Sequence, residues 1–185
     1  IDTALWDWRC RRDGQPLWKA AGGAKQRIPV YTTEGGWLHL PTDTIVAQTL
    51  AAKAAGFKGA KIKVGLPHVS DDVARLKAVR KAVGDGFEIM VDANQCFTLS
   101  EALRRAPRYA ELGIAWFEQP LAANRLTGYR RLREQKALPI LMDEPIVSLT
   151  DLQEFHQLGL LDGVAMKVSR CGGLTEARRI VEYMQ

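Results

Sequence analysis

Five short apolar segments carry charged residues and decide the fold: residues 59–64 (GAKIKV), 88–94 (EIMVDAN), 115–120 (AWFEQP), 139–145 (PILMDEP) and 163–168 (GVAMKV). Read in order, the charges are Lys-x-Lys, Asp, Glu, Asp and Lys. Because an unpaired charge is costly to bury, charged residues rarely end buried strands without a function. The pattern therefore predicts one site built from successive strand ends, with three acids between flanking lysines.

These segments belong to a longer alternation of strands and helices. Strand patterns at 28–33, 59–64, 87–92, 114–118, 138–142 and 162–168 alternate with helix patterns at 42–55, 70–83, 98–112, 125–136, 149–158 and 174–184. Nearly continuous apolar strands between helices indicate a parallel sheet that is covered on both faces. In such α/β folds, ligands bind at the carboxyl ends of the strands.

Two α/β architectures fit this alternation, a doubly wound sheet and a (β/α)8 TIM-type barrel. A doubly wound sheet concentrates its site at one switch point, whereas five consecutive strand ends carry charges here, which favours the barrel. Residues 27–185 supply six of eight βα units, so we expect the last two strands to be missing. Residues 1–26 are predicted to be linker helices that lead into the barrel. The chain does not begin with Met, which suggests a piece of a longer chain.

Composition narrows the class of protein. The net charge is +5, from 26 basic and 21 acidic residues. The basic residues alternate with apolar positions on the predicted helices, as on solvated helix faces, and are not interleaved with aromatics, so we expect no nucleic-acid partner. No apolar run reaches the roughly 20 residues of a membrane span, so we expect no membrane partner. Three widely spaced cysteines indicate free thiols in a reducing cytoplasm.

The Lys61-Ile62-Lys63 motif predicts an acid/base pair. Residues two apart on a strand point to the same face, so the two ammonium groups lie close together. Mutual repulsion and burial each lower the pKa of a lysine. We therefore expect the pKa values of both lysines to fall toward neutral pH, where a lysine can act as a base.

Asp92, Glu118 and Asp143 end the third, fourth and fifth strands, at intervals of 26 and 25 residues. Adjacent strands lie about 4.8 Å apart, so three neighbouring strand ends can bring three carboxylates around one ion. Ligation by oxygen alone favours Mg²⁺ or Mn²⁺. Glu144 competes with Asp143 as the ligand from the fifth strand. Lys167 ends the sixth strand, across the barrel axis from the second, and is predicted to flank the substrate from the opposite side.

At this point the motifs resemble those of a known family, the enolase superfamily, and within it the muconate-lactonizing-enzyme subgroup of mandelate racemase/muconate lactonizing enzyme-like proteins. The likeness covers nearly the whole chain. It is carried by residues 61–63 (KIK), 91–95 (VDANQ), 116–120 (WFEQP), 142–145 (MDEP) and 166–173 (MKVSRCGG), with residues 4–7 (ALWD), 16–18 (PLW) and 22–23 (GG) at the start.

The resemblance implies Mg²⁺ held by Asp92, Glu118 and Asp143. It implies acid/base roles for Lys63 and Lys167, with Lys61 as an electrostatic neighbour and Asn94 beside the metal ligands. Members of the family abstract a proton α to a carboxylate and form an enediolate that Mg²⁺ stabilises. The family also carries an N-terminal α+β capping domain, which we expect to be missing from residues 1–185. We expect a small-molecule carboxylate substrate, and a homo-oligomer for the full-length protein.

Several reactions remain open. Two lysines that flank one intermediate favour a racemase or epimerase of an amino acid derivative or related carboxylate. Dehydration and cycloisomerisation are alternatives within the family, and a Schiff-base aldolase that uses Lys167 is an alternative from another class. Trp37 is predicted either to stack on a cationic substrate group or to pack against the capping domain. Arg170 is predicted either to orient a carboxylate or to pair with a neighbouring acid.

Overall fold

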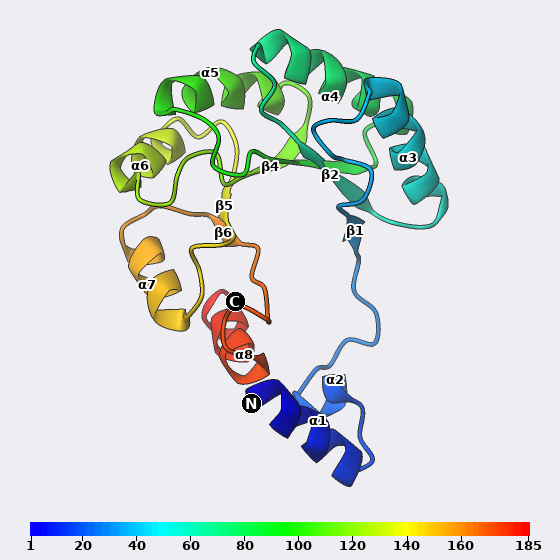
Figure 1. Ribbon diagram of the computed structural model, residues 1–185, viewed down its shortest axis with the longest axis vertical. Helices are drawn as coiled ribbons and strands as arrows, with labels where there is room; N and C mark the ends of the chain where they lie inside the picture. The colour runs from blue at the N-terminus through cyan, green and yellow to red at the C-terminus, as the bar shows by residue number, and fades with distance from the viewer.

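A computed structural model describes residues 1–185 as one parallel sheet with helices on its outer side. The six strands lie in the order β1-β2-β3-β4-β5-β6, and every neighbouring pair is parallel. The sheet curls while helices α3 to α7 follow its convex side, so the molecule forms part of a TIM-type barrel (Figure 1). β6 does not pair with β1, and the barrel is therefore open between them.

The elements follow the predicted alternation. The strands are β1 (Tyr31–Thr32), β2 (Gly59–Lys63), β3 (Glu88–Asp92), β4 (Ile114–Glu118), β5 (Ile140–Met142) and β6 (Gly163–Val164). The helices are α1 (Asp2–Arg12), α2 (Leu17–Ala20), α3 (Thr42–Ala54), α4 (Val69–Val83), α5 (Leu99–Ala110), α6 (Leu126–Glu134), α7 (Leu149–Gln157) and α8 (Leu174–Tyr183). None of the helices is long and apolar enough to cross a membrane.

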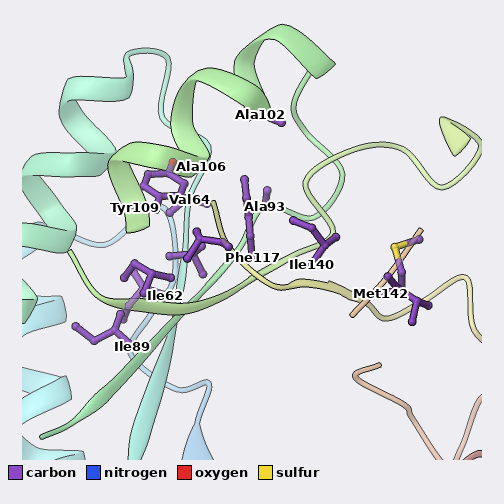
Figure 2. Close-up of a cluster of buried hydrophobic side chains, with 14 of the residues drawn as sticks. Ile62, Val64, Ile89, Ala93, Ala102, Ala106, Tyr109, Phe117, Ile140 and Met142 are labelled. Carbon is purple, nitrogen blue, oxygen red and sulfur yellow. The ribbon is translucent and has the colours of Figure 1, made fainter. Parts of the chain in front are cut away.

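The hydrophobic core lies between the sheet and the surrounding helices. Ile62 and Val64 follow the alternation of β2 and face this core, where they meet Phe117 of β4 and Tyr109 of α5 (Figure 2). All four side chains are nearly inaccessible to solvent. Because strand side chains alternate, Lys61 and Lys63 must face the other side, the interior of the barrel.

The first helix is fixed against the last. Asp2 accepts hydrogen bonds from the backbone nitrogen and the hydroxyl of Thr175, at the start of α8, at 3.1 and 2.5 Å. The Trp6 indole also donates to the Thr175 hydroxyl. Helices α1 and α8 therefore lie side by side, near the two ends of the chain (Figure 1). The division into linker and barrel at residue 26 stays a prediction.

Two predicted strands are shorter than expected. The prediction of a strand over 162–168 is wrong beyond Val164, although the Ala165 nitrogen still donates to the Met142 carbonyl at 2.8 Å. Lys167 therefore does not end a strand but lies three residues after β6. The prediction of 28–33 is likewise reduced to Tyr31 and Thr32. Both strands are at the edges of the sheet, where each has only one neighbour to pair with, and Pro29 has no N–H to donate.

Candidate active site

The carboxyl ends of β2, β3 and β4 bring three charged residues to one level. Lys63 is the register partner of Asp92, and Asp92 is the register partner of Glu118. Register partners on neighbouring parallel strands point to the same face, so these three side chains all project into the barrel. Lys61 lies two residues earlier on β2 and shares that face.

The charges form one continuous network of ion pairs. The Asp92 Oδ2 atom accepts from the ammonium of Lys63 at 2.6 Å and lies 3.1 Å from that of Lys61. Lys61 also donates to Glu118 Oε1 at 2.6 Å. The side chains of Asp92 and Glu118 are 1% and 0% exposed and that of Lys61 is 9% exposed, so the pairs are shielded from water. Such pairs are stable only with good geometry, which these short distances supply.

The expected fall in the pKa of Lys61 is wrong. Burial acts to lower this pKa, but the hydrogen bond and charge of Glu118 and the charge of Asp92 outweigh burial and raise it to about 12. The carboxylates decide the outcome because both lie within about 3 Å of the ammonium. For Asp92, burial opposes ionisation, yet Lys63 and Lys61 hold its pKa below the ordinary value. Burial dominates at Glu118 and raises its pKa.

A second cluster forms at the ends of β5 and β6. The ammonium of Lys167 donates to the carboxylate of Asp143 and, at 3.1 Å, to Glu144. Burial acts to lower the pKa of Lys167, but these two carboxylates raise it. Arg170 Nη1 lies 3.8 Å from Glu144 Oε1, the kind of acid with which it was predicted to pair, and its role at the site stays a prediction. The two clusters thus put ammonium groups at both ends of the row of acids.

The carboxylate oxygens of Asp92, Glu118 and Asp143 are the kind of ligand that a divalent cation such as Mg²⁺ prefers. Glu118 Oε2 and Asp143 Oδ1 are buried and make no hydrogen bond, so each acid keeps an oxygen free for another partner. No group of three or more His, Cys, Asp or Glu side chains converges closely enough to surround an ion. The other oxygens of Asp92, Glu118 and Asp143 face ammonium groups instead. The roles of these acids as metal ligands therefore stay a prediction.

Two of the remaining predicted residues lie around Lys63. Asn94 accepts from the Lys63 ammonium through Oδ1 at 2.6 Å, and its backbone nitrogen donates to Asp92 Oδ1 at 2.9 Å. Its φ of 44° is left-handed, a conformation in which Asn is enriched. The ring of Trp37, on the loop after β1, lies 5.8 Å from the same ammonium. The face of this indole thus already has a cation from the protein beside it.

Sequence reasoning missed Gln119. This residue follows Glu118, is fully buried and adopts a left-handed φ of 42°. Burial acts to raise the pKa of Glu144, but Lys167 and, to a smaller extent, the nearby Gln119 amide lower it. Neither amide atom makes a hydrogen bond of good geometry. The signal was available, because Gln119 lies in the same FEQP segment as Glu118.

The fold and the site define a class of protein, a partial α/β barrel with carboxylates between lysines at the carboxyl ends of its strands. The model of the enolase C-terminal domain-like family matches residues 44–185. The chain belongs to the enolase superfamily, in its mandelate racemase/muconate lactonizing enzyme-like group.

Known relatives in this family carry out different reactions. The chain is 34% identical over 182 residues to L-talarate/galactarate dehydratase of Salmonella typhimurium, covering 98% of this chain and 46% of the relative. It is 35% identical over 183 residues to hydrophobic dipeptide epimerase of Roseobacter litoralis, covering 98% and 52%. A racemase structure from Streptomyces coelicolor A3(2) with bound magnesium superposes with a TM-score of 0.92 at 34% identity, covering 97% and 54%. The chain thus spans about half the length of the proteins that it matches.

Proposed function

We propose that this chain carries the proton-transfer site of a Mg²⁺-dependent enzyme that abstracts the proton α to a carboxylate of a small molecule and forms an enediolate. The observation that carries the proposal is the row of acids with ammonium groups at both ends. Lys61 and Lys63 lie at Asp92 and Glu118, and Lys167 lies at Asp143. Family membership and the magnesium in the related racemase support it.

The residues have separate tasks. Bound Mg²⁺, with Mn²⁺ as a substitute, supplies positive charge that stabilises negative charge on the substrate's carboxylate oxygens. Asp92, Glu118 and Asp143 would hold it, and the buried Glu118 Oε2 and Asp143 Oδ1 atoms have no other partner. Lys63 exchanges a proton with one face of the α-carbon and Lys167 with the other. Lys61 adds a fixed positive charge between Asp92 and Glu118.

Proton donors on both faces support racemisation or epimerisation of an amino acid derivative or related carboxylate. The dehydratase relative supports dehydration equally, with loss of a β-hydroxyl group from the same enediolate. A Schiff-base aldolase needs a neutral Lys167 amine as nucleophile. The family match weighs against that alternative.

Hydrogen exchange in D₂O tests the proposal. The protein, at its full natural length and with Mg²⁺, is incubated with a panel of N-acyl amino acids, dipeptides and hexarates. We expect α-deuterium in the product, with unchanged mass otherwise for epimerisation and loss of water for dehydration. Lys63→Ala and Lys167→Ala should each abolish exchange at one face. Lys58→Ala, at the exposed opposite end of β2, is the matched control. Exchange that survives in both site variants would refute the assignment.

A further inference from the structure

A cavity of about 260 Å³ opens beside Lys63, between the loops that follow β1, β2 and β3. Its lining includes Trp37 and His39 from the first loop and Asn94 and Cys96 from the third. Pockets for whole small ligands occupy roughly 300–1,000 Å³. This cavity is smaller, so it fits one part of a ligand whose reacting carbon lies at Lys63.

The wall from the first loop is held rigidly. Gly36 accepts a hydrogen bond from the Lys63 nitrogen at 2.7 Å, and a Cβ on this glycine would lie 2.2 Å from the Lys61 carbonyl oxygen. Leu38 follows Trp37 and Leu40 follows His39. The buried Arg75 of α4 donates a hydrogen bond to the carbonyl of each of these leucines, both at 3.0 Å. Trp37 and His39 are therefore exposed side chains on an immobilised backbone.

The loops after β2 and β3, which form the other walls of the cavity, are also fixed by hydrogen bonds. Asp72 of α4 accepts from the nitrogens of Gly65 and Leu66 on the loop after β2, at 3.0 and 3.3 Å. On the loop after β3, the Gln95 nitrogen donates to the Gln119 carbonyl at 2.7 Å. All three loops are thus anchored to neighbouring elements, as expected of a preformed binding site.

The polar groups in this cavity have unused hydrogen-bonding capacity. The only side-chain bond of Asn94 is the one that its oxygen accepts from Lys63, so its NH₂ group is free to donate. The His39 ring makes no hydrogen bond within the protein, and it offers one donor and one acceptor when neutral. Trp37, Leu38 and Ala93 give part of the lining an apolar character. Free donors and an acceptor beside an aromatic face suit a carbon chain that carries hydroxyl groups.

We propose that this cavity binds the hydroxylated carbon chain of the substrate, on the Lys63 side of the α-carbon, through Trp37, His39 and Asn94. The proposal rests on the function proposed above and narrows its substrate to a hydroxylated carboxylate. Trp37 and His39 are specificity residues here, with no part in proton transfer.

Cys96 provides a test that does not depend on turnover. Cys96 is an exposed residue that lines the cavity, and burial of its thiol raises the pKa of that thiol, whereas Cys10 lies on α1 and Cys171 is buried. The full-length protein with Mg²⁺ is alkylated with iodoacetamide, and each cysteine is quantified by peptide mass spectrometry. Galactarate, a hydroxylated six-carbon diacid, should slow alkylation of Cys96 but not of Cys10. Adipate, the same diacid without hydroxyl groups, and N-acetylmethionine should give little protection.

Variants identify the residues responsible. His39→Leu should weaken protection by galactarate about fivefold, the effect of one neutral hydrogen bond, while His68→Leu, at an exposed histidine outside the cavity, leaves it unchanged. Trp37→Phe should retain protection better than Trp37→Ala. Equal protection by adipate or N-acetylmethionine, or no effect of His39→Leu, would overturn the proposal. Absence of α-proton exchange with every substrate would instead count against the proposed function, since alkylation is read without turnover.

Discussion

The buried ion pair between Asp72 of α4 and Arg105 of α5 offers the sharpest test of the packing. The two side chains are 0% and 1% exposed, and Arg105 Nη1 lies 2.5 Å from Asp72 Oδ2. Asp72 also accepts from the Tyr109 hydroxyl at 3.0 Å. Burial outweighs these contacts and raises the pKa of Asp72, which shows how much desolvation offsets the attraction.

Asp72→Ala leaves the guanidinium of Arg105 buried without its main partner. Breaking a buried pair in this way costs about 3–5 kcal/mol. This is a large part of the roughly 5–15 kcal/mol that stabilises a typical domain. The double variant Asp72→Leu/Arg105→Met removes both charges and keeps apolar volume. It should cost less than Asp72→Ala, because only neutral groups lose partners: the nitrogens of Gly65 and Leu66, the carbonyls of Leu66 and Pro67, and the Tyr109 hydroxyl.

Urea unfolding followed by circular dichroism measures both free energies. Glu101→Gln is the control, because Glu101 contacts the same Arg105 at 3.1 Å but is 32% exposed, so we expect a much smaller loss than for Asp72→Ala. The reasoning is refuted if Asp72→Ala costs less than about 1.5 kcal/mol, or if the double variant is less stable than the single one.

Three further predictions concern other contacts. Arg80→Ala should lower the free energy of unfolding by about 2–4 kcal/mol in the same assay, because Arg80 donates to four backbone carbonyls. Gly36→Ala should displace the loop after β1, costing about 1–3 kcal/mol and visible as a shift of Trp37 in a crystal structure. Hydrogen bonds from Thr175 lower the pKa of Asp2, so the α1–α8 contact should be intact at neutral pH and weaken as the pH falls below the ordinary value of 3.8. Trp6 fluorescence, measured in a variant whose other four tryptophans are replaced by Phe, should report this change, and Asp2→Asn should abolish its pH dependence.

Most of the fold follows from local pattern. The helix and strand predictions agree with the structure within a few residues in the middle of the sheet, because apolar strands with two neighbours continue as far as their sequence pattern does. The edge strands were predicted too long, since pairing there ends where the single neighbour ends. Lys63, Asp92 and Glu118 end their strands as predicted, whereas Lys167 lies three residues after β6.

The sequence by itself determined which charges meet, because parallel strands align their carboxyl ends and a period of two directs Lys61, Lys63, Asp92 and Glu118 to one face. Only the tertiary structure decided the sign of the pKa shift at Lys61. That sign depends on distances across three strands: two carboxylates lie within about 3 Å of the ammonium and outweigh burial. The cavity beside Lys63 was also hidden in the sequence, because its walls come from three loops that are fixed by Arg75, Asp72 and Gln119, none of which shows a local signal for such contacts.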